Sequence, residues 1–281
     1  MLVRNIFLAI IKKVPTFAAR KRYKHNHAMK EKRHAAIIDL LLKTGSVQVA
    51  YLVEELNVSS VTIRKDLSEL EKQGKLFRSH GKAILINPHI TNRSVSDKEK
   101  IAPDAKRLIG HEAARLIDRN DSILIASGST VHALARCIQP IHRLTVVSAS
   151  LVVSEILALN ENIDIIQLGG MLRHSSLSVV GQYSEQVLGQ FSFSKLYLGV
   201  DGIDLDYGIT TTDMREAELN QKMMAAAQKT IVLADSSKFG RRGFAKISDM
   251  EQVDVIITDD GISPQNVHAV EELGIDLIIA R

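Results

Sequence analysis

Cysteine is almost absent from the sequence, with Cys137 as the single thiol among 281 residues. One thiol cannot build an intramolecular disulfide framework or a cysteine zinc site, and this scarcity fits a reducing cytoplasm. The ten histidines do not cluster at metal-ligand spacing. Two phosphate-binding patterns, G-x-G-x-x-G and G-x-x-x-x-G-K-[ST], are also missing. The sequence therefore predicts no metal, no dinucleotide cofactor and no P-loop.

Long apolar runs are missing as well. The most hydrophobic N-terminal stretch, residues 2–11, is too short and too interrupted to span a bilayer. No clear small-residue cleavage site for a signal peptide follows it. No fixed-period repeat or low-complexity tract is present. With 45% hydrophobic residues and enough length for two ordinary domains, the chain is expected to be a cytoplasmic protein with real cores and no membrane partner.

Acidic residues are missing from residues 1–30, which contain eight Lys or Arg. The net charge is only +4, so the rest of the chain has more acids than bases, and binding of a polyanion must be local. We interpret residues 1–28 as a basic extension outside the native protein, with Met29 as the natural start. The alternative is a basic tail that adds non-specific DNA affinity.

Residues 58–74 have the pattern of an amphipathic helix with defined ends. Ser59 or Ser60 can accept the unpaired backbone N–H groups of its first turn, and Gly74 offers a left-handed stop. Three apolar residues recur at i, i+4 and i+7 and predict one buried stripe: Ile63, Leu67 and Leu70.

The opposite face of this helix is short, polar and basic. Arg64 and Lys65 project from it and can reach phosphates or guanine edges, while Val61 can touch a thymine methyl. A helix with this face can enter the major groove of double-stranded DNA. The candidate DNA-binding residues of the helix are Ser59, Ser60, Val61, Thr62, Arg64 and Lys65.

The flanking segments decide between a packing helix and a recognition helix. Residues 35–42 and 49–56 each predict a helix, and a tight turn separates the second from the capped helix, which makes a helix-turn-helix. Residues 75–86 alternate and turn at His80-Gly81, as a two-stranded wing does. The wing would carry Arg78, His80 and Lys82 to the phosphate backbone; a protein-binding winged helix is the alternative.

The rest of the chain predicts a different architecture. Residues 87–98 contain turn formers without an apolar period and are interpreted as a linker. A helix is expected over residues 103–117. Short β-rich runs then alternate with helical stretches, at residues 123–125, 144–147, 163–168, 196–198, 230–233, 253–257 and 275–279. This order predicts an α/β domain with a largely parallel sheet.

Three loops after these strands have residues suited to an anion. Ser127, Gly128, Ser129 and Thr130 open a helix whose positive terminus suits a phosphate, although a tight turn with a capping hydroxyl explains the motif equally well. Gly169 and Gly170 allow close backbone approach or simple chain reversal. Lys238 adds a cation, although a lone loop lysine is usually only solvated. Because ligands bind where parallel strands end, the three loops together indicate a small anionic ligand.

The motifs of both halves resemble one family. Residues 58–74, V-S-x-x-T-I-R-K-D-L-x-x-L-E-x-x-G, with R-x-H-G-x-A at 78–83, are similar to the N-terminal signature of DeoR-family bacterial transcriptional regulators. Lys65 and Lys82 depart from it, standing where a second Arg and a second Gly are common. The similarity extends over almost all of residues 30–281, through segments 127–130, 169–173, 199–204, 208–210, 216–218 and 233–239.

The resemblance implies a winged helix-turn-helix over residues 30–86 and a sensor domain over residues 99–281, similar in fold to sugar-phosphate isomerases. In that family the sensor binds phosphorylated sugars. At the matching positions of this sequence, the resemblance implies that Gly128, Ser129 and Thr130 would bind the phosphate. The sugar would face Asp201, Glu218 and Lys238.

The implied function is a repressor of a sugar or amino-sugar catabolic operon, relieved by its effector and acting as a homo-oligomer, a dimer or tetramer, on operator DNA. Residues 198–212 resemble AgaR-like regulators of amino-sugar catabolism. Ala126 and Ser148-Ala149 depart from the family pattern near the expected pocket. The alternative is an active isomerase with an appended DNA-binding domain, in which the same carboxylates and lysine do acid–base work; the recognition helix favours a sensor without catalysis.

Overall fold

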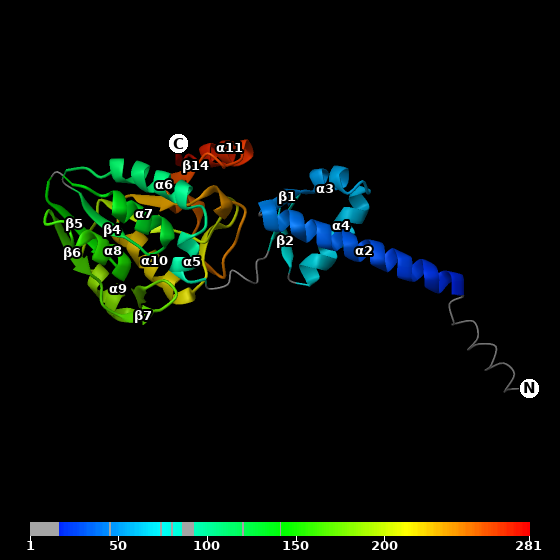
Figure 1. The fold of residues 1–281 in the computed structure, drawn as a ribbon, viewed down its shortest axis with the longest axis horizontal. Coiled ribbons are helices and arrows are strands. Elements are labelled where there is room, and N and C mark those ends of the chain that lie inside the picture. The colour runs from blue at the N-terminus through cyan, green and yellow to red at the C-terminus, as the bar shows by residue number, and fades with distance from the viewer. Residues whose placement is uncertain are drawn as a thin grey trace, which may run out of the picture. The chain divides into compact units, whose positions relative to one another are not determined.

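A computed structural model describes residues 17–44, 46–73, 75–79, 81–85, 93–119, 121–140 and 142–281 of the chain (Figure 1). The chain divides into two compact units, with the boundary between Ile84 and Leu85. The predicted residues His80 and Gly74 lie outside the described part. In that part, none of the helices has both the length and the apolar character needed to cross a bilayer.

The N-terminal unit combines helices with a small antiparallel sheet of order β1-β3-β2. Both predicted leading helices are confirmed within α2 and α3, and the two wing strands are β2 and β3. The wing prediction was incomplete, because β1 adds a third strand, with Ser46 opposite Ile84. The elements are α2 (Phe17–Thr44), β1 (Ser46–Gln48), α3 (Val49–Glu55), α4 (Ser60–Lys72), β2 (Leu76–Ser79) and β3 (Lys82–Leu85).

Helix α4 has the start that the sequence predicted. The Ser59 hydroxyl accepts a hydrogen bond from the Thr62 N–H at 3.3 Å, which satisfies one of the unpaired donors of the first turn. The predicted stripe is fully buried, and apolar residues of the unit's other elements are buried as well: Ile37, Leu41, Val47, Leu52, Leu76, Ala83 and Ile84.

A buried carboxylate fixes α4 against α2. Asp66 is only 3% exposed, and both its oxygens accept hydrogen bonds from Arg33, at 2.5 and 3.0 Å. The ring of His34 lies 3.2 Å from the same carboxylate. A buried charge is tolerated when it is paired and hydrogen-bonded in this way. Closer to the surface, Lys30 forms an ion pair with Glu69 one turn further along α4.

The C-terminal unit is built on a seven-stranded parallel sheet, which confirms the predicted α/β fold. Its strand order is β15-β14-β12-β9-β4-β5-β6, and every neighbouring pair is parallel. All seven predicted β-rich runs overlap its strands. The strands are β4 (Ser122–Ile125), β5 (Leu144–Ser148), β6 (Ile163–Gln167), β9 (Lys195–Gly199), β12 (Thr230–Leu233), β14 (Val255–Asp259) and β15 (Asp276–Ala280).

Alternating strand residues supply two separate cores, one on each face of the sheet. Ile123 and Ile125 pack into one core and Leu124 into the other, as the two-residue period of a strand requires. The first core is covered by α6 (Pro103–Arg115), α7 (Ser129–Cys137) and α8 (Leu151–Leu157), and the second by α9 (Gln182–Leu188), α10 (Met214–Ala226) and α11 (Pro264–Glu272). The helix expected over residues 103–117 is therefore confirmed as α6.

Several short elements were not expected. Residues 93–98 were interpreted as linker, yet α5 (Val95–Glu99) forms there because contacts with the folded unit stabilise it rather than an apolar period of its own. The 169–181 and 199–211 segments form antiparallel hairpins whose strands are too short to show a period. The remaining elements are β7 (Met171–Arg173), β8 (Ser178–Val180), β10 (Gly202–Asp204), β11 (Gly208–Thr211), β13 (Ala245–Ser248) and the 3-10 turns η1 (Ser236–Lys238) and η2 (Met250–Gln252).

Candidate functional site

A pocket lies where the central strands β4 and β9 end, beside the end of β12. Parallel strands all deliver their following loops to one edge of the sheet, which is where ligands bind in such folds. The pocket is small and partly open to solvent. It is lined by Arg93, Val95, Lys98, Ser127, Gly128, Ser129, Thr130, Arg173, Ser175, Ser176, Gly199, Val200, Asp201, Thr211, Glu216 and Lys238.

The loop after β4 opens helix α7 towards this pocket. Gly128 is the N-cap residue, with φ 127° and ψ 161°, a conformation essentially restricted to glycine. A Cβ there would meet no atom within 4 Å, so backbone conformation rather than space requires the glycine. Ser129 and Thr130 are buried in the first turn. The N–H groups of a first turn have no partner within the helix, and with the helix dipole they favour an anion.

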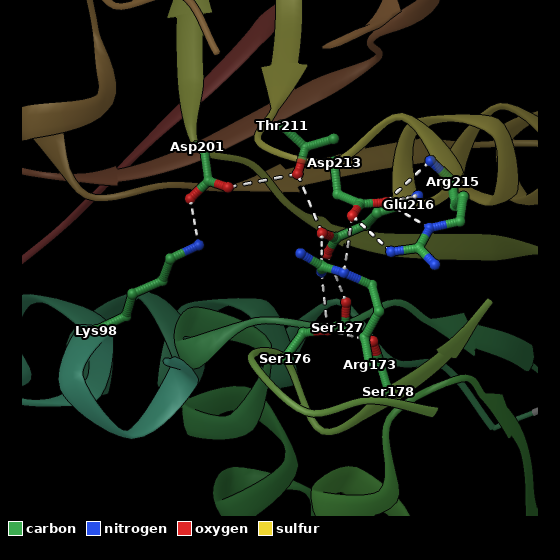
Figure 2. Close-up of polar contacts among 10 residues, drawn as sticks. All are labelled: Lys98, Ser127, Arg173, Ser176, Ser178, Asp201, Thr211, Asp213, Arg215 and Glu216. Carbon is green, nitrogen blue, oxygen red and sulfur yellow. Dashed lines mark hydrogen bonds and ion pairs between the residues drawn. The ribbon is translucent and has the colours of Figure 1, made fainter. Parts of the chain in front are cut away.

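Asp201 follows β9 and faces Lys98 across the pocket (Figure 2). Its Oδ1 accepts a hydrogen bond from Lys98 Nζ at 2.6 Å, and Lys238 Nζ lies 4.0 Å from the same oxygen. The Thr211 hydroxyl is 3.3 Å from Oδ2. Burial opposes ionisation, but the two lysines outweigh it and hold the pKa of the Asp201 carboxyl below its usual range.

Glu216, on the first turn of α10, is the second carboxylate of the pocket. It accepts hydrogen bonds from Ser127 Oγ at 2.9 Å and from Arg173 Nη1 at 2.6 Å, and Thr211 lies between it and Asp201. Burial raises the pKa of Glu216; Arg173 counteracts this shift, and the charge of Asp201 adds to it. The cluster therefore joins loops from three distant parts of the chain into one wall.

The buried Arg173 guanidinium holds this wall in place. Besides Glu216, it donates to Ser176 Oγ at 2.9 Å, and its Nε lies 3.3 Å from Asp213 Oδ2. Asp213 also caps α10 by accepting from the N–H of Glu216. This arrangement fixes the carboxylate of Glu216 relative to the 127–130 loop.

The structure brings most of the sequence-predicted pocket residues together. Ser127, Gly128, Ser129, Thr130, Asp201 and Lys238 all line the pocket. The expectation for Glu218 was wrong in geometry: its side chain is exposed, and Glu216 occupies the pocket. Residues two apart on a helix differ by about 200° in direction, so only one of the two can face inward.

Gly169 and Gly170 also lie outside the pocket. A Cβ on Gly170 would stand 2.7 Å from the carbonyl oxygen of Val180, so this glycine permits close packing of the hairpin. The Gly169 carbonyl accepts from Ser184 Oγ at 2.5 Å. The two glycines therefore fit the alternative interpretation of this motif, in which they allow the chain to reverse.

Sequence reasoning missed several lining residues. Arg173 and Glu216 stood inside matched motifs without being chosen, and Glu216, Asn220 and Met223 recur at i, i+4 and i+7, which was a usable signal for the inner face of α10. Lys98 and Arg93 were hidden in the predicted linker, and no pattern marked Thr211. Among the residues that the structure describes, no group of three or more His, Cys, Asp or Glu is arranged to hold a metal ion.

The predicted DNA-contacting residues occupy the surface of the N-terminal unit. Val61 is 60% exposed, and Arg64 and Lys65 are exposed beside it on α4. Thr62 is half-buried and its hydroxyl lies 3.0 Å from that of Ser59. Ser59 and Ser60 are exposed at the cap and Lys82 is half-buried on β3.

The side chain of Arg78, one of the predicted wing residues, is hydrogen-bonded to a carboxylate of its own unit. Its Nε donates to Glu71 Oε2 at 2.8 Å and its backbone N–H to Oε1 at 3.0 Å. The bond orients the guanidinium, whose side chain is 39% exposed.

Two family models match the chain, one on each unit. Residues 33–89 match the DeoR-like helix-turn-helix domain, and residues 101–260 match the DeoR C terminal sensor domain. The chain belongs to the DeoR family. It is a DNA-binding transcriptional regulator, and both its DNA-binding and its sensor domains are those of DeoR proteins.

Two curated relatives each cover almost nine-tenths of the chain. A putative aga operon transcriptional repressor from Escherichia coli O157:H7 is 36% identical over 88% of this DeoR-family chain and 93% of its own length. The HTH-type transcriptional repressor GlcR of Bacillus subtilis is 30% identical over 89% and 96%. Among solved structures, the full-length sorbitol operon regulator SorC from Klebsiella pneumoniae covers 73% of this chain and 89% of its own, with 12% identity and a TM-score of 0.34. Ribose 5 phosphate isomerase A from Neisseria gonorrhoeae covers 48% and 52%, with 18% identity and a TM-score of 0.34.

Proposed function

We propose that this protein represses a sugar or amino-sugar catabolic operon and that a phosphorylated sugar, bound in the pocket at the ends of β4 and β9, relieves the repression. The DNA partner is a double-stranded operator contacted through α4 and the wing. The proposed acting species is a homo-oligomer, in which two copies of α4 can contact two half-sites.

The charge of the pocket is the observation that carries the proposal. Its lining contains the cations Arg93, Lys98, Arg173 and Lys238 and the carboxylates Asp201 and Glu216, an excess of two positive charges. A phosphate monoester carries roughly −1.5 to −2 at neutral pH and presents three acceptor oxygens. The N-terminus of α7, with Gly128, Ser129 and Thr130, supplies the N–H and hydroxyl donors for those oxygens.

The carboxylate wall supports a sugar as the remainder of the ligand. Asp201 and Glu216 both line the pocket, and carboxylates accept hydrogen bonds from sugar hydroxyls or from an ammonium group. Both are held rigidly, Asp201 by Lys98 and Glu216 by Arg173. A preorganised acceptor loses little freedom on binding, which favours a polyhydroxylated partner.

Such a ligand changes repression only through its different affinity for the DNA-binding and non-binding states. Thermal unfolding of the purified protein with a panel of sugar phosphates, each paired with its unphosphorylated sugar, tests whether the pocket binds a phosphorylated sugar. A ligand at one hundred times its Kd stabilises by about 2.7 kcal/mol. Only phosphorylated sugars are expected to raise the midpoint, and amino-sugar phosphates have priority because a relative is named for the aga operon.

The ligand found in this way should then weaken binding to operator DNA in a gel-shift titration. No midpoint shift with any phosphate, or a shift with no change in DNA affinity, contradicts the proposal. Turnover of aldose phosphates by the same preparation would instead support the isomerase alternative. Light scattering of the protein gives its oligomer size.

A further inference from the structure

Helix α5 places one of its residues in the pocket. Lys98 lines the pocket and donates to Asp201 at 2.6 Å, as Figure 2 shows. In the sequence, α5 starts ten residues after Leu85, the last residue of the wing strand β3. A pocket residue therefore lies on the element nearest, along the chain, to the DNA-binding unit.

Both ends of α5 contact segments that border the 127–130 loop. The Val95 N–H donates to the carbonyl of Ser175, another pocket residue, at 2.6 Å. At the other end, Glu99 lies 3.0 Å from the ring of His132 and accepts from Arg136 at 3.1 Å. Both partners are on α7, the helix that begins at the loop, so α5 is connected to the 127–130 region through side chains.

His132 extends this connection into the core. The ring is fully buried, and its Nε2 lies 3.1 Å from the hydroxyl of Ser150, the cap of α8. The Glu99 carboxylate can only accept, so His132 Nδ1–H donates to it; Nε2 of the neutral ring then accepts from the Ser150 hydroxyl, whose oxygen also accepts from the Val153 N–H. Glu99 is thereby fixed relative to helices α7 and α8, which cover one face of the sheet.

A buried lysine holds the turn between α5 and α6. Lys106 is 4% exposed, and its ammonium donates to the carbonyls of Lys98, at 2.6 Å, and Ile101. The turn includes Ala102 in the left-handed region, at φ 47°. The C-terminal end of α5 is thus a defined structure, and a shift of the Lys98 backbone would change these contacts.

We propose that Lys98 is a ligand-contacting residue and that α5 is the element through which occupation of the pocket reaches the segment leading to the DNA-binding unit. This inference rests on the proposed function. Without ligand, Lys98 is paired with Asp201. A phosphate held by the 127–130 loop competes for its ammonium, and a sugar hydroxyl takes its place on Asp201, so the bound state has a different set of contacts at α5.

Hydrogen–deuterium exchange of the full chain, with and without saturating inorganic phosphate, tests this assignment. The readout is exchange of the amides of residues 95–101, and phosphate affinity is measured in parallel by calorimetry. The variants are Lys98→Met, which removes the charge at similar length, Lys98→Arg, which keeps it, and the control Lys100→Met. Lys100 is on the same segment, but its side chain is 77% exposed and paired only with Asp97 among the residues described.

In the wild type and in Lys100→Met, phosphate is expected to change exchange at residues 95–101. Lys98→Met should lose that response and bind phosphate about tenfold more weakly, as expected for one hydrogen bond between charged groups. Lys98→Arg should retain most of the exchange response and most of the phosphate affinity.

If Lys98→Met keeps the wild-type phosphate affinity and exchange response, the assignment of Lys98 fails while the sensor proposal stands. If the wild type binds phosphate without any change at α5, the coupling fails. If it binds neither phosphate nor any sugar phosphate, both proposals fail together.

Discussion

Replacing Asp66 by alanine should destabilise the DNA-binding unit selectively. The substitution removes two hydrogen bonds between charged groups and leaves Arg33 without its partner. Breaking a fully buried ion pair costs roughly 3 to 5 kcal/mol, but the Arg33 side chain is 19% exposed and can regain water. We therefore expect a loss of about 2 to 3 kcal/mol in the free energy of unfolding of this unit.

Hydrogen exchange of the full chain measures this loss separately for each unit. Protection of the α4 amides should fall about 30- to 150-fold, the factor that corresponds to the expected loss, because these amides exchange through opening of the N-terminal unit. Protection of β9 and β12 in the other unit should not change. The control is Glu69→Ala, three residues along α4, which removes the partly exposed pair with Lys30 and should alter protection little. A fall in Asp66→Ala no larger than in this control would refute the role of the buried carboxylate.

Three further substitutions test the two surfaces and the connection behind α5. Arg64→Ala should weaken DNA binding by about 1 to 3 kcal/mol in a gel shift, and unchanged affinity would mean that α4 does not enter the groove. Gly128→Ala should cost about 1 to 3 kcal/mol of stability and reduce phosphate affinity because alanine is strained at this φ, whereas Gly189→Ala, at φ −63°, should do neither. Burial lowers the pKa of His132 in the folded state, so the unfolded chain takes up its proton first as the pH falls below 6.5. Thermal stability should therefore fall between pH 6.5 and the lower folded pKa, and His132→Gln should flatten this dependence; an unchanged profile would exclude His132 as its source.

The sequence predicted those parts of the fold in which local pattern and tertiary packing agree. The stripe of Ile63, Leu67 and Leu70 set the phase of α4, and each parallel strand was short, apolar and bounded by turn residues. Helix α5 could not be found this way, because five residues without an apolar stripe become helical only through partners such as Ser175 and His132. Strands of three or four residues in the hairpins likewise show no period.

The pocket was predictable where its chemistry is contiguous in sequence. Ser127 to Thr130 form one motif at a strand end, and they line the pocket as a block. The choice between Glu216 and Glu218 depended instead on the rotation of α10 about its axis, which Asp213 sets at the helix start. Lys98 was invisible because its segment lacked any sign of order.

The order of the two units along the chain has a consequence for synthesis. The DNA-binding unit has its own core and is complete once β3 has left the ribosome, whereas the pocket needs residues from Arg93 to Lys238. At roughly 5 to 20 residues per second, the residues from Leu85 to the last strand take about 10 to 40 s to be made. During that interval each nascent chain carries a recognition helix without a pocket for the ligand, so the surface that contacts DNA is made before the site that senses the ligand.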